Sequence, residues 1–342
     1  MILFLVLMIV SIWVIISKSG SYSLDLLVET FKNASLPWLF VACSTIFLNI
    51  FFEGKALDIL ILALNKSENN AKIKSHGLLY SSADIYFSAI TPSASGGQPA
   101  SAYFMSRDGI SMAQSAVVLL SNMLLYTISL AMIGLFGFVS SPHTFFSFDT
   151  PAKALIIVGS LFIIGLCVIF VLILKKEQWV KKIVVVLISI GAKLHLIRHK
   201  ETKMVRIEQS IEQYKNSVKL INSEKKYMIS ALIMNILQRL STIGTTLFVY
   251  LAFGGSISNI NEIVNVQSMV LIGVYSIPFV PGGIGVADYI LINGLDQIPD
   301  VPSPANLELV SRGISFYCCI GLSILIMIIG YIIQSKKMKK NK

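Results

Sequence analysis

Two glycine- and proline-containing sequences interrupt apolar segments of this 342-residue chain, and both could bind an anion. Glycine lets the backbone approach a ligand closely, and a helix that follows it presents unpaired N–H groups and a positive dipole end to phosphate. We therefore expect the two sequences to bind a phosphate-bearing lipid headgroup. The alternative is that the glycines only permit tight helix packing. The candidate residues are Gly96, Gly97 and Gln98 in the segment 91–99, and Gly282, Gly283 and Gly285 in the segment 278–285.

Ionisable residues within or beside the apolar segments include Asp84, Arg239, Asp288 and Arg312. An arginine at the centre of a membrane helix costs about 2.5–3.5 kcal/mol on insertion scales, so it needs a partner or water. Our hypothesis is that these four side chains face one polar cavity. The alternative is that Arg–Asp pairs only stabilise the helix bundle.

Sequence patterns typical of catalysis are missing. The four histidines have no metal-ligand spacing, the four cysteines form no CxxC pair, and neither a phosphate-binding loop nor a nucleophile elbow is present. We therefore predict no catalytic residue, no metal and no cofactor, and expect a translocator rather than an enzyme.

The composition predicts an all-α integral membrane protein. Hydrophobic residues make up 55% of the chain and charged residues 13%, whereas soluble domains carry about 25% charged residues. The net charge of +10 is concentrated between apolar segments and at the C-terminus, which is typical of cytoplasmic loops and argues against nucleic acid as a partner.

Six apolar segments are long enough to cross a bilayer, because a spanning helix needs about 17–25 residues. Two further apolar segments, 77–106 and 266–294, each contain one of the glycine-rich interruptions. The six predicted spans are 1–17, 36–53, 112–140, 153–174, 227–253 and 309–333.

The distribution of Lys and Arg predicts the orientation of the chain. Segment 55–74, Arg107, segment 175–226 and the C-terminal tail are basic and should be cytoplasmic, as should the N-terminus. The loops 141–152, 254–265 and 295–308 should be external.

Both interrupted segments then begin and end on the same side, so each should be a re-entrant helical hairpin. Segment 77–106 should enter from the cytoplasm and segment 266–294 from outside. This arrangement makes residues 1–342 one polytopic domain whose halves, 1–174 and 227–342, form an inverted repeat, as in secondary transporters. The alternative is that each interrupted segment crosses as a kinked helix.

Residues 175–226 form the largest polar region. Apolar residues recur there at spacings of three and four, which predicts an amphipathic helix. Its apolar face could dock a cytoplasmic partner or lipid headgroups, or the helix could fold back against the bundle. The face consists of Met204, Ile207, Ile211, Tyr214, Val218 and Ile221.

Several motifs resemble those of a known family. Gly96-Gly97-Gln98 followed by Arg107-Asp108-Gly109, the sequence from Pro281 to Asp288, and Ser311-Arg312 are similar to motifs in the membrane region of lysylphosphatidylglycerol synthases, also called multiple peptide resistance factors. The resemblance covers nearly the whole chain. One departure is Asp288, where the family usually has Glu; the shorter side chain puts direct headgroup contact from this position in doubt.

The resemblance implies a lipid flippase. Such a protein moves aminoacylated phosphatidylglycerol from the inner to the outer leaflet of a bacterial cell membrane, which is linked to resistance to antimicrobial peptides. In full-length relatives a separate soluble domain makes that lipid from aminoacyl-tRNA. A phosphatidylglycerol lysyltransferase label could be inherited from those relatives, but we expect no such activity here. The expected partners are an anionic or aminoacylated phospholipid, a separate synthase, and a second copy of the chain. The alternatives are a scaffold that recruits a lipid-modifying enzyme through residues 200–222, and a transporter of a small anion.

Overall fold

The computed structural model describes residues 32, 34–65, 75–91, 94–175, 200–278, 280, 283 and 285–340. All regular elements in these residues are helices, and no strand occurs among them, which confirms the all-α class. The predicted span 1–17 lies outside the described residues.

Four helical segments are long and apolar enough to cross a membrane, as judged by length and composition. They correspond to the spans predicted at 112–140, 153–174, 227–253 and 309–333. The span predicted at 36–53 lies within α3 (Leu36–Asn65), which continues well beyond the predicted end. The total of six spans stays a prediction. The four segments are α6 (Met112–Ser140), α8 (Thr150–Lys175), α11 (Lys225–Ala252) and the continuous run Pro304–Lys336, which comprises α14 (Pro304–Arg312), a π-helical turn (Gly313–Cys318) and part of α15 (Cys319–Lys340).

Helices α3 and α11 form a central antiparallel pair. The Ser35 N–H donates to the Ala252 carbonyl over 2.8 Å, and the Thr45 and Thr245 hydroxyls are 2.6 Å apart. Residues later in α3 therefore contact residues earlier in α11, so the two helices are antiparallel. The inverted repeat of the two halves stays a prediction.

The first interrupted segment folds as a hairpin of α4 (Gly77–Ile90) and α5 (Gly97–Arg107). Helices of 14 and 11 residues are about 21 and about 17 Å long, too short for a hydrocarbon core of about 30 Å. At the open end, His76 Nδ1 lies 2.8 Å from Asp108 Oδ2. The Ser101 hydroxyl donates to the Tyr80 carbonyl and joins the two limbs. We call this pair of helices the first hairpin.

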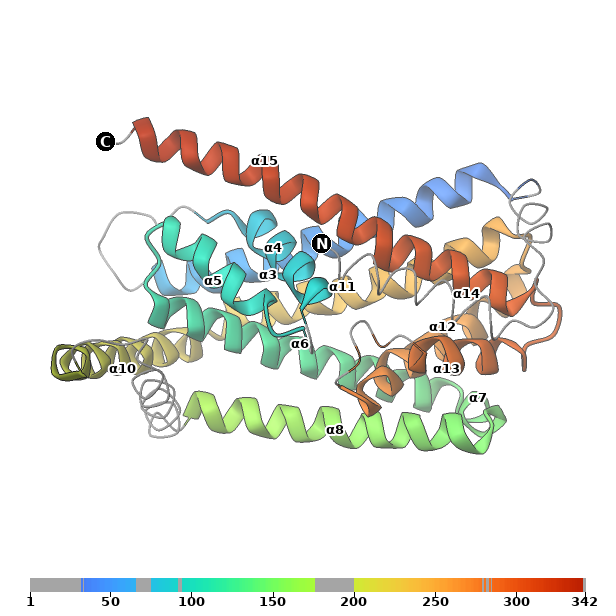
Figure 1. The fold of residues 1–342 in the computed structure, drawn as a ribbon. Helices are drawn as coiled ribbons and strands as arrows, with labels where there is room; N and C mark the ends of the chain where they lie inside the picture. The colour runs from blue at the N-terminus through green and yellow to red at the C-terminus, as the bar shows by residue number, and fades with distance from the viewer. Residues whose placement is uncertain are drawn as a thin grey trace.

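The second interrupted segment also folds as a hairpin. Its limbs are α12 (Ile260–Gly273), extended by the 3₁₀ turn η3 (Val274–Ser276), and α13 (Val286–Leu295). The Asn259 amide donates to the Pro299 carbonyl over 2.8 Å and closes the open end. This second hairpin enters the bundle from the end opposite to the first, and the tips of both lie toward the middle of the molecule (Figure 1).

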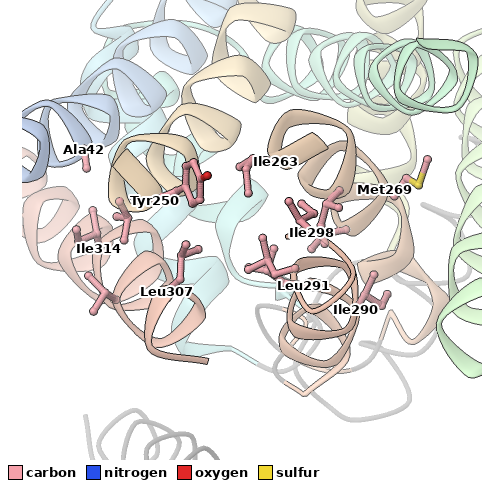
Figure 2. Packing of buried hydrophobic residues seen from close by; sticks show 14 of the residues in the cluster. Ala42, Tyr250, Ile263, Met269, Ile290, Leu291, Ile298, Leu307 and Ile314 are labelled. Atoms are coloured by element: carbon pink, nitrogen blue, oxygen red, sulfur yellow. The ribbon is translucent and has the colours of Figure 1, made fainter. Parts of the chain in front are cut away.

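The largest apolar core holds the second hairpin between α11 and α14. Figure 2 shows Tyr250 and Leu307 from the flanking helices beside Ile263 and Leu291 from the hairpin limbs. A Cβ atom on Gly294 would lie 2.6 Å from Val266 Cγ1, so glycine is needed for α13 to approach α12 this closely.

The amphipathic helix is α10 (Lys200–Ser223), and it folds back against the bundle. Tyr214 and Ile221 are buried in a core shared with α3, α4 and α6, and the Tyr214 hydroxyl donates to the Ile173 carbonyl over 3.1 Å. Burial raises the pKa of this hydroxyl to about 12, so it remains a neutral donor. The bundle therefore covers this part of the apolar face; the side chains of Met204 and Ile207 lie outside the described residues.

Candidate functional site

A buried polar network lies where the first hairpin meets the α3–α11 pair. Glu53 of α3 is 8% exposed and accepts a 2.8 Å hydrogen bond from Gln238 Nε2 of α11. The charge of Asp84 of α4 also acts on Glu53. Asp84 in turn accepts a 2.8 Å hydrogen bond from Gln98 Nε2 of α5. We call Glu53 and Asp84 the carboxyl pair.

Gly97 brings α5 against the carboxyl pair. A Cβ atom at this position would lie 1.9 Å from Asp84 Oδ1 and 2.1 Å from the Ser88 hydroxyl oxygen. The Asp84 carboxyl thus lies at the N-terminus of α5, where the helix dipole favours an anion. The anion beside this N-terminus in the structure is therefore a side chain of the protein itself.

Arg239 connects α11 to the second hairpin. Its Nη1 donates to the Tyr126 hydroxyl over 3.0 Å, and its guanidinium carbon lies 4.3 Å from the centre of the Tyr126 ring. The Tyr126 hydroxyl is 2.7 Å from that of Tyr275, which belongs to η3 near the hairpin tip. Because Gln238 is bonded to Glu53 of α3, which packs against the first hairpin, two consecutive residues of α11 connect to the surroundings of both hairpins.

Three buried polar atoms of this network have no hydrogen-bond partner: Gln98 Oε1, Gln238 Oε1 and Arg239 Nε. Leaving a buried donor or acceptor unpaired costs about 1–3 kcal/mol. Such atoms therefore mark places where a ligand or an ordered water completes the network.

A second polar cluster lies beside the second hairpin. Arg312 of α14 forms a short ion pair with Asp288 of α13, and its Nε donates to Glu308 Oε1 over 3.2 Å. The other Asp288 oxygen accepts a 2.8 Å hydrogen bond from the Gly285 N–H. Both carboxylate oxygens of Asp288 are thus engaged, as the local-pairing alternative expects. We call Asp288, Glu308 and Arg312 the arginine cluster.

The structure places the predicted site residues in these two groups. In or beside the network lie Gly97, Gln98, Asp84 and Arg239. Asp288 and Arg312 belong to the arginine cluster, and the Gly285 N–H donates to it. The remaining glycines have local roles or are undescribed: the Gly96 N–H donates to Thr91 Oγ1 over 2.8 Å, Gly283 has a positive φ of 63°, and Gly282 lies outside the described residues. Headgroup binding by these residues stays a prediction.

Sequence reasoning missed Glu53, Tyr126 and Tyr275. The predicted span ended at residue 53, whereas α3 continues to Asn65 and places Glu53 near its middle. An acid within a long apolar helix is a signal that could have singled out Glu53. The two tyrosines carry no such signal, since tyrosine is common in apolar helices.

An apolar hollow of about 320 Å³ lies between α6, α8 and α12. It begins about one helical turn from the tyrosine pair, because Ala131 follows Tyr126 on α6 and Ile272 precedes Tyr275. Ser160, the polar residue of its lining, donates its hydroxyl to the Ile156 carbonyl. The wall contributed by α8 includes Leu161 and Ile164, which are 64% and 57% exposed. The hollow can therefore accept an apolar chain beside a buried cation.

Comparison with known proteins identifies the family. A family model described as the lysylphosphatidylglycerol synthase TM region matches residues 1–323. The chain belongs to this family. No curated protein and no solved structure matches it. Family membership confirms the resemblance carried by the glycine motifs and, with the four apolar helices, indicates a membrane protein with a role in handling lysylphosphatidylglycerol.

Proposed function

We propose that this protein translocates a polar phospholipid, lysylphosphatidylglycerol or a close relative, from the inner to the outer leaflet, and does not synthesise it. The observation that carries the proposal concerns two adjacent residues of α11. Gln238 is bonded to Glu53 of α3, the helix that packs against the first hairpin, and Arg239 is linked through Tyr126 to Tyr275 of the second hairpin. Family membership supplies the class of lipid.

The network offers polar partners to a charged headgroup inside the membrane, which lipid translocation requires. A charged headgroup cannot cross about 30 Å of hydrocarbon unaided, because burying an unpaired ion is prohibitive. Arg239 offers a guanidinium whose Nε has no partner, and a planar guanidinium suits a phosphate oxygen. The apolar hollow one turn away accepts part of an acyl chain, while the rest of the tails stay in lipid.

The opposed hairpins supply a means of alternating access. Their limbs are too short to cross the hydrocarbon core, so we propose that they are re-entrant and that the two halves form an inverted repeat. Irregular backbone at membrane depth is tolerated where protein surrounds it or a polar cavity adjoins it. Small shifts of either tip against α11 would open the network to one leaflet at a time.

Reconstitution tests the transport. Vesicles containing the protein and fluorescent lysylphosphatidylglycerol are exposed to a membrane-impermeant quencher, and the lipid that becomes accessible is followed over time. We expect Arg239→Gln to slow the exchange at least tenfold and the exposed α10 variant Lys219→Gln to leave it unchanged. Exchange by the unaltered protein at the rate of empty vesicles would overturn the proposal.

Labelling tests the re-entrant arrangement. In a chain whose four native cysteines are replaced, Ser95→Cys and Ile277→Cys place single thiols at the exposed tips of the two hairpins. An impermeant thiol reagent should label Ser95→Cys faster from the cytoplasmic side and Ile277→Cys faster from outside. Labelling of both thiols from the same side of the membrane only would contradict the re-entrant arrangement.

A product assay tests the absence of synthesis. Incubation of the reconstituted protein with phosphatidylglycerol and lysyl-tRNA should yield no lysylphosphatidylglycerol above protein-free vesicles. Formation of that lipid would show that the chain is itself a transferase.

A further inference from the structure

Three polar residues lie on one face of α11 within about one helical turn. Asn235, Gln238 and Arg239 are spaced by three and four residues, so their side chains leave the helix in similar directions. They are 0%, 2% and 8% exposed. Each keeps one buried polar atom without a hydrogen-bond partner among the described residues: Asn235 Oδ1, Gln238 Oε1 and Arg239 Nε. We call these three residues the α11 polar face.

The hydrogen bonds that are present determine which atoms of this face remain free. The Asn235 amide nitrogen donates to Asn122 Oδ1 of α6 over 3.0 Å and to the Ala231 carbonyl over 2.9 Å, which uses both of its N–H groups. The Gln238 amide nitrogen donates to Glu53 over 2.8 Å. A carboxylate only accepts, so Gln238 cannot turn its amide oxygen toward Glu53 without losing that bond. The atoms left for a ligand are therefore two acceptors and one guanidinium donor.

The α11 polar face lies next to the apolar hollow along α6. Asn235 is bonded to Asn122, and one turn later on both helices Arg239 is bonded to Tyr126. Four residues advance about 6 Å along a helix. Farther along α6, the lining of the hollow begins at Ala131. The order along α6 is therefore amide oxygens, then a guanidinium, then an apolar hollow.

A phospholipid carries complementary groups in the same order. Its phosphate can accept from Arg239 Nε, one acyl chain can enter the hollow, and the group beyond the phosphate then meets the amide oxygens of Asn235 and Gln238. An amide oxygen accepts and does not donate, so that group needs N–H or O–H donors. A primary ammonium and a glycerol hydroxyl both meet this requirement. The trimethylammonium of choline has the charge of an ammonium but no N–H.

We infer that Asn235 and Gln238 select lipids whose headgroup carries hydrogen-bond donors beyond the phosphate, and that they reject quaternary ammonium headgroups. A headgroup without donors would leave both buried amide oxygens unpaired, and a site built to hydrogen-bond its ligand discriminates strongly against an analogue that lacks the bond. This inference rests on the proposed translocation and adds the headgroup chemistry that the site admits.

A competition experiment tests this selection without requiring transport. Purified protein in micelles is offered phosphatidylethanolamine and phosphatidylcholine with identical acyl chains, and native mass spectrometry measures the ratio of the two lipids bound. Both lipids have one phosphate and one positive charge, and they differ in carrying N–H groups or methyl groups. We expect phosphatidylethanolamine to be favoured about tenfold or more. Equal binding would overturn the inference and would indicate that ordered water completes the amide oxygens.

A second competition identifies the kind of donor. Phosphatidylglycerol, whose donors are hydroxyls, replaces phosphatidylethanolamine against the same choline lipid. We expect it to be favoured as well, because an amide oxygen accepts from O–H and N–H alike. A preference confined to one of the two lipids would support the inference and identify its donor as the group that is recognised.

Variants separate hydrogen bonding from the larger size of choline. Asn235→Leu and Gln238→Met replace each amide by an apolar side chain of similar size, and each should lower the preference severalfold. Ser241→Ala is the matched control, because the buried Ser241 hydroxyl of α11 already donates to the Leu237 carbonyl. It should retain the full preference. The ratio is measured within one sample, so partial unfolding reduces the binding of both lipids together. An unchanged preference in both amide variants would overturn the inference.

Transport in vesicles distinguishes failure of this inference from failure of the proposed translocation. Tail-labelled phosphatidylethanolamine and phosphatidylcholine are followed with the impermeant quencher described above. Translocation of both lipids at the same rate would overturn the selection and leave the proposed translocation intact. Selective binding in micelles without translocation in vesicles would support the selection and contradict the proposed function.

Discussion

The two hairpins differ in the partners of an aspartate that lies at the N-terminus of the second limb. Each has an aspartate at the N-terminus of its second limb: Asp84 beside Gly97 in the first hairpin, and Asp288 bonded to the Gly285 N–H in the second. Asp288 is neutralised by Arg312. Asp84 instead accepts hydrogen bonds from the neutral side chains of Gln98 and Ser88.

This difference indicates which hairpin can respond to a ligand. Breaking a buried ion pair by removing one partner costs about 3–5 kcal/mol, so the arginine cluster holds the second hairpin to α14. Amide and hydroxyl partners do not cancel the charge of Asp84, so a cationic group of a ligand would still be attracted to it. We therefore assign the arginine cluster to positioning the second hairpin, and we expect a ligand to act on the first.

The largest effect on stability should come from breaking the arginine cluster. Arg312→Met leaves Asp288 and Glu308 buried without their cation and should destabilise the protein by about 3–5 kcal/mol, measured by denaturant unfolding in micelles. Asp288→Asn in the same chain should recover part of the loss, and Lys219→Met should have little effect. An unchanged midpoint for Arg312→Met would remove the distinction between the two hairpins.

The close contact at the first hairpin should be the next most sensitive. Gly97→Ala places a methyl group against Asp84 and Ser88 and should destabilise by about 1–3 kcal/mol, because the limbs must separate. Gly165→Ala on α8 is the matched control, since no atom lies within 4 Å of the added methyl. Equal thermal midpoints for the two variants would show that the limbs do not need this approach.

The open ends of the hairpins allow a direct comparison. Asp108 accepts hydrogen bonds from both His76 and Tyr80, whereas Asn259 donates one to the Pro299 carbonyl from an exposed position. Asp108→Asn should cost about 1–3 kcal/mol and Asn259→Ala about 0.5–1.5 kcal/mol. Hydrogen exchange followed by mass spectrometry should show faster exchange in α4 and α5 for the first variant. A larger loss of stability for Asn259→Ala than for Asp108→Asn would contradict this comparison of the two open ends.

The smallest expected effect concerns the tyrosine pair. Tyr275→Phe removes one hydrogen bond to Tyr126 and leaves the contact of Arg239 with Tyr126 in place. We expect a loss of about 0.5–1.5 kcal/mol in unfolding free energy and a rate of lipid exchange within threefold of the unaltered protein. If Tyr275→Phe slowed lipid exchange as much as we expect for Arg239→Gln, the second hairpin would contact the headgroup directly.

Much of the fold could be predicted because its signals are local. Long apolar runs predict the helices near 112–140, 153–174, 227–253 and 309–333, and proline with glycine predicts where the hairpins turn. The amphipathic period predicts α10 and its buried face. The full extent of α3 was missed, because its polar residues after position 52 lower the local hydropathy.

The sequence by itself determined that the chain is helical and apolar enough for a membrane, where its two interruptions fall, and to which family it belongs. It also showed that Asp84, Arg239, Asp288 and Arg312 need partners. Only the tertiary structure decided that Asp84 is bonded to Gln98 of α5 while Asp288 is paired with Arg312 of α14. The reason is that partners on different helices are set by how each helix is rotated and shifted against its neighbours. Residues 31 positions apart, such as Ile50 and Ser81, meet only through that packing.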